Sequence, residues 1–273
     1  MPVGRVTNSM QPFYIPIPEA ELFAVYHQPR PGLSRESAVV LCYPLGHEYL
    51  NSHRAYRQIA MLLGDAGYPV LRFDYLGCGD SGGSCEQAGV AVWRRNVSRA
   101  VAELQAKSGA IRLCLIGLRL GATLALQAAA ETGPVESLVL WDPIVRGSSY
   151  LQELERFHKR VLDMTETSSG GVTRPAAYDG LSLFGFGPQL RHELAAIDLL
   201  SIQRKPAEHV LLLESVIESS PANLLAERLQ QRGSSVERKC IPGDASWRQD
   251  FDSLLFPGQA VPAVVRWVSE VCA

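Results

Sequence analysis

The sequence predicts an α/β domain in which a mostly parallel sheet is covered by helices on both faces. Apolar runs of strand length alternate with longer segments of helical periodicity over most of the chain. The run at residues 38–43 is continuously apolar, as expected of a parallel strand that is buried on both faces. Regular alternation of this kind is typical of a parallel sheet with crossover helices. The 273 residues are enough for one such domain with a well-buried core.

The expected elements follow from these patterns in chain order. A short N-terminal hairpin is predicted at residues 13–18 and 21–27. Strands are predicted at residues 38–43, 69–75, 111–116, 135–141, 209–214 and 236–241. Helices between and after them are predicted at residues 53–66, 90–107, 120–131, 221–232 and 261–272. Gly67 and Gly109 follow two of these helices, where a glycine readily ends a helix in the left-handed conformation.

The alternation stops between residues 143 and 205. Residues 150–164 and 190–200 predict two helices, and the stretch between them is rich in Gly, Ser and Pro. We interpret residues 143–205 as an inserted cap or lid within a single domain that spans residues 1–273. The aromatic residues of this segment, which include Phe157 and Phe186, either roof an apolar pocket or anchor the cap on the core.

Composition excludes several classes of function. The formal net charge is only -2, and no basic run or nucleic-acid-binding motif is present, so neither nucleic acid nor an anionic membrane is expected as a partner. No segment approaches the roughly 20 apolar residues that span a bilayer. The N-terminal residues lack the apolar stretch of a signal peptide, so a cytoplasmic location is expected. The oligomeric state is left open.

Metal and cofactor chemistry is not expected. The six cysteines form no Cys-x-x-Cys pair, and no Asp/His cluster has metal-ligand spacing. Most of the cysteines are therefore interpreted as reduced structural thiols.

One strand–turn–helix segment carries a chemical motif. Residues 114–125 read Cys-Leu-Ile-Gly-Leu-Arg-Leu-Gly-Ala-Thr-Leu-Ala, so an apolar strand enters a turn between Gly117 and Gly121 and an Ala/Leu-rich helix leaves it. This is the context of a nucleophile elbow, whose sharp turn needs glycines near the backbone. Arg119 stands at its centre. A guanidinium stays protonated in proteins and cannot attack a carbonyl.

Three further stretches complete a resemblance. They are Tyr-Pro-Leu-Gly-His-Glu-Tyr-Leu-Asn-Ser-His-Arg at 43–54, Arg-Phe-Asp-Tyr-Leu-Gly-Cys-Gly-Asp-Ser-Gly-Gly at 72–83, and Leu-Trp-Asp-Pro at 140–143. With these, the chain resembles the α/β-hydrolase superfamily over nearly its whole length, and most closely the bacterial serine-aminopeptidase-like and exosortase-system-associated hydrolases. The resemblance implies an α/β-hydrolase fold with a cap, and a nucleophilic serine at the position of Arg119.

The chain departs from the catalytic triad that this resemblance implies. The family's histidine falls in the loop at 243–250, which contains none, and no histidine follows His209. The family's acid would be Glu214 or Glu218. A Ser–His–acid triad needs the base to take the nucleophile's proton and the acid to orient the base. Triad chemistry is therefore not expected, and whether the protein is an enzyme stays open.

Two roles are open for Arg119. At the carboxyl edge of the sheet and at a helix N-terminus, a cation needs a compensating carboxylate. Asp142 is the best-placed partner, with Asp74 and Glu48 as alternatives, and such an ion pair would fill the site. Alternatively, Arg119 faces a pocket and binds a carboxylate or phosphate group. The remaining residues expected at this anion-binding pocket are Leu118, Leu120, Gly46 and His47.

A substitute nucleophile is also conceivable. Cys78 and His47 follow two strands whose loops open on the same sheet edge, so they could form a Cys–His dyad. Otherwise Cys78 fills a small slot in a glycine-rich turn and His47 is a polar loop residue. The sequence thus predicts a protein that binds an acyl or anionic small molecule, or a partner, without triad chemistry. The alternative is an active esterase, thioesterase or peptidase with an unconventional nucleophile such as Cys78.

Overall fold

The computed structural model describes residues 9–84, 87–168, 186–215, 220–242 and 258–272. Its described part contains an eight-stranded sheet of order β1-β2-β4-β3-β5-β6-β7-β8. The β1–β2 and β2–β4 pairs are antiparallel, and every other neighbouring pair is parallel. The predicted α/β class with a mostly parallel sheet is therefore confirmed.

The strands lie close to where the apolar runs place them. They are β1 (Met10–Pro16), β2 (Glu21–His27), β3 (Ser37–Cys42), β4 (Val70–Phe73), β5 (Arg112–Leu118), β6 (Val135–Trp141), β7 (Ala207–Glu214) and β8 (Ser235–Cys240). The central strands β3 and β4 are buried at every residue, which explains why their runs are mostly apolar, with Ser37 and Arg72 as the polar members. β4 ends two residues earlier than predicted, because Asp74 and Tyr75 already belong to the turn that follows.

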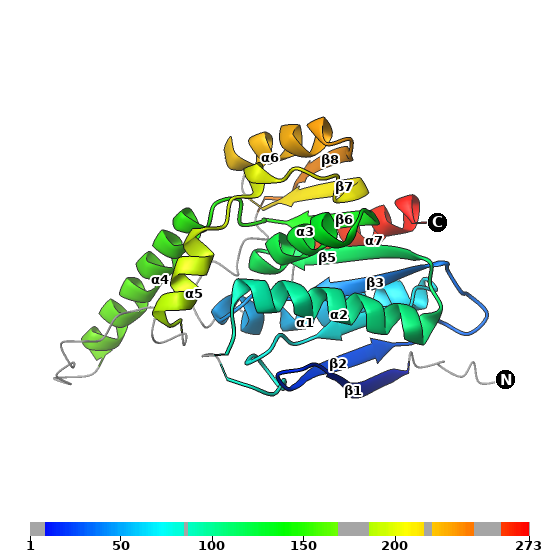
Figure 1. Ribbon diagram of the computed structural model, residues 1–273, viewed down its shortest axis with the longest axis horizontal. Coiled ribbons are helices and arrows are strands. Elements are labelled where there is room, and N and C mark those ends of the chain that lie inside the picture. Colours follow the sequence, from blue (N-terminus) through cyan, green and yellow to red (C-terminus); the bar gives the residue numbers. More distant parts are fainter. Residues whose placement is uncertain (1–8, 85–86, 169–185, 216–219, 243–257, 273) are drawn as a thin grey trace.

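The helices form two layers on the sheet. They are α1 (His47–Asp65), α2 (Val90–Ser108), α3 (Leu120–Thr132), α4 (Gly147–Ser168), α5 (Pro188–Ala195), α6 (Ser220–Gln231) and α7 (Ala260–Val271), with a 3₁₀ turn η2 (Leu199–Ser201). Helices α2 and α3 cover one face and α1 and α7 the other (Figure 1). The hydrophobic core fills the space between these helix layers and the sheet. A site therefore has room only at the ends of the strands, where the loops follow their carboxyl ends.

The segment between β6 and β7 interrupts this pattern as the sequence predicts. It contributes α4 and α5, which pack on each other beyond the carboxyl ends of the strands (Figure 1). The predicted helix at 190–200 is instead two pieces, α5 and η2. Asp198 separates them, because its backbone is extended. Its side chain accepts from the Leu200 amide at 3.0 Å and so caps the start of η2.

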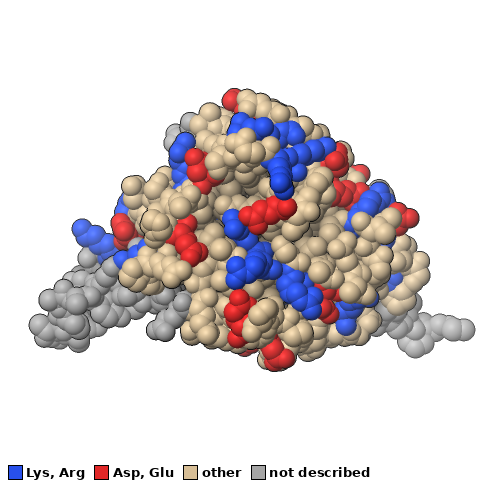
Figure 2. Space-filling view, viewed as in Figure 1, with Lys and Arg blue, Asp and Glu red and all other residues tan. Residues whose placement is uncertain are grey.

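Charge on the face formed by α2 and α3 is mixed. Figure 2 shows Lys and Arg side chains interleaved with Asp and Glu over this face. Arg94 pairs with Glu131 at 3.0 Å, and Arg99 pairs with Glu103 at 2.9 Å. Among the described helices, none is long and apolar enough to cross a membrane. The cytoplasmic location stays a prediction.

Candidate active site

The turn between β5 and α3 has the sharp geometry predicted for it. Arg119 adopts φ 54° and ψ −122°, a backbone conformation that residues other than glycine rarely adopt. Backbone strain of this kind costs about 1–3 kcal/mol. Its amide donates to the Trp141 carbonyl at 2.9 Å, and its carbonyl accepts from the Ala122 and Thr123 amides. The surrounding ladder and helix therefore hold the strained residue in place.

The two glycines of this turn are required by close packing. A Cβ on Gly117 would lie 2.4 Å from the Ala122 backbone, and one on Gly121 would lie 2.1 Å from the Cys42 carbonyl oxygen. Both distances are far below van der Waals contact. The helix α3 can thus approach β3 and β5 closely only because these positions carry no side chain.

Arg119 is the centre of a buried charge cluster, which we call the Arg119 cluster and define as Arg119, Glu48, Tyr150 and Glu153. Nε of Arg119 donates to Glu48 Oε1 at 2.7 Å, and Nη2 donates to Glu153 Oε2 at 2.6 Å. The Tyr150 hydroxyl donates to Glu48 Oε2 at 3.3 Å, and the guanidinium lies over the Tyr150 ring at 5.5 Å. The cluster therefore joins the β5–α3 turn to α1 and α4.

The electrostatics of the cluster keep Arg119 charged. Burial alone lowers the pKa of Arg119, but Glu48 and Glu153 outweigh burial and raise it above its ordinary value. Burial raises the pKa of Glu48, and Arg119 opposes this rise. Side chains of Arg119 and Glu48 are only 4% and 2% exposed, whereas that of Glu153 is 38% exposed. The Arg119–Glu48 pair is thus the buried half of the cluster.

Asp142 does not pair with Arg119, which corrects the expectation that it is the best-placed partner. Its Oδ1 accepts from the Ser215 amide at 3.0 Å, and its buried Oδ2 has no hydrogen-bond partner among the residues that the structure describes. Asp142 also has a positive φ of 43°. Of the two alternatives, Glu48 is the partner. Asp74 is held elsewhere, by the Tyr49 hydroxyl and the Asp80 amide, both at 3.0 Å.

His47 lies in a helix and not in a loop. Gly46, with φ 60°, caps α1, so the helix begins at His47, six residues earlier than the sequence pattern indicates. The His47 ring stacks on Phe157 of α4 with ring centroids 3.9 Å apart. This contact ties α1 to α4 one residue away from Glu48, and it shows that Phe157 anchors the inserted segment on the core.

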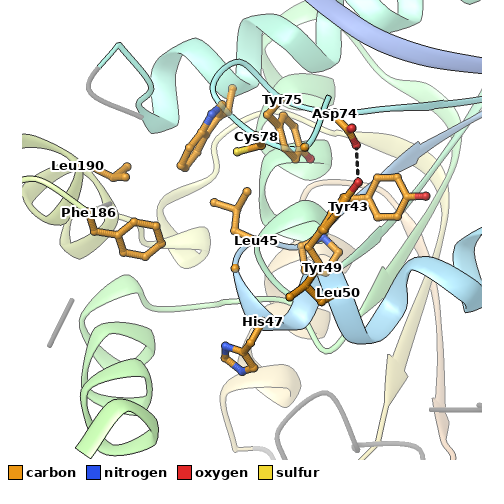
Figure 3. A pocket seen from close by; sticks show the side chains of 14 residues that line it. Tyr43, Leu45, His47, Tyr49, Leu50, Asp74, Tyr75, Cys78, Phe186 and Leu190 are labelled. Carbon is orange, nitrogen blue, oxygen red and sulfur yellow. Dashed lines mark hydrogen bonds between the residues drawn. The ribbon is translucent and has the colours of Figure 1, made fainter. Parts of the chain in front are cut away.

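An apolar cavity of about 390 Å³ opens beside these loops, and we call it the apolar pocket. It is lined by Tyr43, Pro44, Leu45, Gly46, His47, Tyr49, Leu50, Asp74, Tyr75, Cys78, Gly79, Trp93, Phe186 and Leu190. The wall comes from the loops after β3 and β4, from α1 and α2, and from α5 with Phe186 before it (Figure 3).

The structure places Cys78 and His47 in the same pocket but not against each other. Figure 3 shows the two side chains on opposite sides of Leu45, with the imidazole directed away from the thiol. Leu118 and Leu120 flank Arg119 and are fully buried in the core, and neither lines the pocket. Gly46 does line it. Of the residues that the sequence proposes for the site, Gly46, His47 and Cys78 therefore line the apolar pocket, and the same wall contains Tyr49, Trp93 and Leu190, which sequence reasoning missed.

A second, smaller cavity of about 220 Å³ lies on the other side of the elbow. Its wall includes Arg119, Asp142, Tyr150, Glu153 and Glu214. Glu214 accepts from Arg238, with Nη2 to Oε2 at 2.5 Å. Among the described residues, the wall also includes Arg146, which lies 3.7 Å from Asp198, so three carboxylates face two guanidinium groups here. The loop at 243–250 and Glu218 lie outside the described residues.

Comparisons with known proteins agree with this geometry. A family model for serine aminopeptidases of the S33 type matches residues 36–174. No match was found among curated proteins. An esterase from Pyrococcus furiosus, Pf2001, has a TM-score of 0.66 at 17% identity, over 98% of this chain and 92% of that one. Est1E from Butyrivibrio proteoclasticus with ferulic acid bound has a TM-score of 0.63 at 16% identity, over 94% and 96%.

A proline iminopeptidase from Mycobacterium smegmatis is also similar, with a TM-score of 0.58 at 14% identity over 95% of this chain and 98% of that one. At these identities the solved structures define the fold alone. The sheet order, the elbow and these likenesses define an α/β-hydrolase. The family match covers just over half of the chain, which therefore belongs to the S33 serine aminopeptidase family.

Proposed function

We propose that this family member does not use Ser–His–acid chemistry and instead binds an acyl or other apolar small molecule in the apolar pocket. One observation carries the proposal: Arg119 stands at the elbow, where the family places its nucleophile, and its Nε and Nη2 are bonded to Glu48 and Glu153. A protonated guanidinium held in this way is no nucleophile. The absence of any histidine after His209 removes the family's base as well.

The apolar pocket supports the binding part of the proposal. Aromatic rings of Tyr43, Tyr49, Tyr75, Trp93 and Phe186 contribute to its wall, and such rings bury large apolar ligand surfaces. We propose that residues 143–205 act as a cap here, since Phe186 and Leu190 of this segment close one side. Est1E, which shares the fold, is a structure with ferulic acid bound, so aryl esters are suitable probes.

Binding of an anion at Arg119 has less support. Only Nη1 of Arg119 is without an acceptor among the described residues. The cavity beside it presents the carboxylates of Asp142, Glu153 and Glu214 against one further guanidinium group, that of Arg146, so the surplus of negative charge disfavours a bound anion. Binding of a partner protein would also be a non-catalytic function, but no specific contact of the described residues favours it.

The second candidate function is hydrolysis that uses Cys78. This thiol is half-buried and lines the apolar pocket, where an acyl group would lie. Against this function, His47 stacks on Phe157 and is directed away from the thiol. A cysteine becomes a strong nucleophile at neutral pH when an adjacent histidine lowers the pKa of its thiol, and the orientation of His47 does not favour this role.

Two assays on the same purified chain test the proposal. The first follows hydrolysis of p-nitrophenyl acetate and octanoate and of an acyl thioester. The second follows intrinsic tryptophan fluorescence, to which Trp93 in the pocket wall contributes, while methyl octanoate or methyl cinnamate is added, with Trp93→Phe as the variant that identifies the pocket signal. We expect saturable binding and no turnover above a heat-denatured control. Turnover that Cys78→Ser abolishes, while the matched exposed-thiol variant Cys240→Ser retains it, would establish the second candidate instead.

A further inference from the structure

The apolar pocket has one carboxylate in its wall and no cation among the described residues that line it. The carboxylate belongs to Asp74, which is buried, with 5% of its surface exposed. Tyr49 donates to one of its oxygens and the Asp80 amide to the other. Burial raises the pKa of Asp74, as expected where negative charge is poorly solvated.

Three guanidinium groups around the pocket are engaged by other groups, and one of them, Arg191, donates from Nε to the Phe186 carbonyl at 2.9 Å. Arg72 lies behind Tyr43, where its Nη1 donates to the tyrosine hydroxyl at 2.8 Å and its Nε donates to His27 at 2.9 Å. It is buried and is not part of the pocket wall. Arg119 lines the other cavity and is paired with Glu48. Neither Arg72 nor Arg119 is therefore placed to receive a charged group inside the apolar pocket.

A ligand carboxylate in this pocket would lose water without gaining a cationic partner. Burial of an unpaired charge is strongly unfavourable, and a second carboxylate near Asp74 adds repulsion. A neutral ester, amide or thioester of the same acid avoids both costs and keeps the contact of its apolar part with the aromatic wall. The difference in affinity thus depends on charge and not on shape.

We propose that the apolar pocket selects uncharged ligands, and takes the ester, amide or thioester of an acyl or aryl acid in preference to the free carboxylate. The inference rests on the proposed function, because it names the ligand class of that same pocket. It also reverses the anionic alternative that Arg119 suggests in the sequence. The cation at the elbow is neutralised by Glu48 and Glu153, and the described wall of the apolar pocket carries one carboxylate and no guanidinium or ammonium group.

The test titrates the full chain at pH 8 with two matched pairs, methyl octanoate against octanoate and methyl cinnamate against cinnamate. We expect each ester to bind at least about ten-fold more tightly than its acid, because the charge is the only large difference within a pair. Equal or tighter binding of the acids would overturn the selectivity while leaving the proposed function intact. Binding of neither member of any pair would overturn the proposed function and the selectivity with it.

A variant that adds a positive charge at the pocket mouth makes the cause testable without disturbing the core. Leu50 lines the pocket and is 64% exposed, so Leu50→Lys brings a cation to its mouth at little cost in folding. We expect this variant to bind the acid more tightly, and the ratio of ester affinity to acid affinity should therefore fall. The matched control Leu224→Lys changes an exposed leucine of α6 outside the pocket and should leave the ratio unchanged. An unchanged ratio in Leu50→Lys would contradict a charge-based selection.

Discussion

Nε of Arg119 donates to Oε1 of Glu48 over 2.7 Å, and both side chains are almost completely buried. The pair joins the strained turn before α3 to the first turn of α1. Each charge is tolerable only because the other is present, since an isolated ion in the protein interior loses its hydration. The elbow is therefore occupied by a structural ion pair, and a substitution of either residue should change stability mainly through the charge that it leaves unpaired.

Removing the charge of Arg119 should strongly destabilise the fold. Arg119→Met leaves Glu48 buried without its cation, and we expect a loss of about 3–5 kcal/mol in the free energy of unfolding. Urea unfolding followed by circular dichroism measures it. The double variant with Glu48→Gln should recover much of the loss, because neither charge is then left unpaired. A loss below about 1 kcal/mol in Arg119→Met would show that the pair is not structural.

Glu153 should contribute less than Arg119 to the free energy of unfolding, and its main effect should be to hold α4 on the core. Its side chain is 38% exposed, so Glu153→Gln should cost about 1 kcal/mol or less. Hydrogen exchange of the amides in α4 should nevertheless accelerate, because the Nη2 contact is one of the bonds that hold this helix on the core. Glu155→Gln, an exposed neighbour on the same helix, is the control, and equal exchange in both variants would refute the role.

The fold was predictable because its signals are local. Apolar runs identify the strands, and Gly117 and Gly121 mark a turn whose close contacts exclude any side chain. The partner of Arg119 was not predictable in the same way. Helical periodicity starts α1 near residue 53, whereas Gly46 starts it at His47, and this shift places Glu48 in the buried first turn.

Glu153 was missed for a different reason. Its contact with Arg119 depends on how α4 lies on the core, and a pattern within one helix does not specify that orientation. A signal was present nonetheless: Tyr150, Glu153 and Phe157 share one face of a helix by their spacing, and two of them are aromatic. An acidic residue on an otherwise aromatic face indicates a buried cation opposite it.

The close approach at the elbow gives a sharp prediction for glycine. In Gly121→Ala the added Cβ would meet the Cys42 carbonyl oxygen at 2.1 Å, and backbone cannot move aside as a side chain can. We expect a loss of more than about 3 kcal/mol or failure to fold. Gly187→Ala is the matched control, because no atom lies within 4 Å of its added Cβ and its φ is −63°. Similar melting temperatures for the two variants would contradict the packing argument.

His27 should make stability depend on pH. Burial, followed by Arg72 and then Arg57, lowers the pKa of His27 from 6.5 to about 4. Its Nε2 accepts from Arg72 at 2.9 Å, which requires the neutral ring. Between about pH 6.5 and pH 4 the unfolded chain binds a proton that the folded chain does not, so the folded state loses stability as the pH falls. The loss from this residue should reach about 3 kcal/mol at pH 4.

The raised pKa values of Glu48 and Asp74 act in the opposite sense, because the folded chain then binds protons before the unfolded chain does. The contribution of His27 must therefore be read as a difference between variants. Urea unfolding of the wild type and of His27→Gln, whose amide oxygen can still accept from Arg72, should diverge as the pH falls from 7 to 4. His209→Gln, at an exposed histidine, should follow the wild type. Parallel curves for wild type and His27→Gln would mean that the buried imidazole does not oppose protonation.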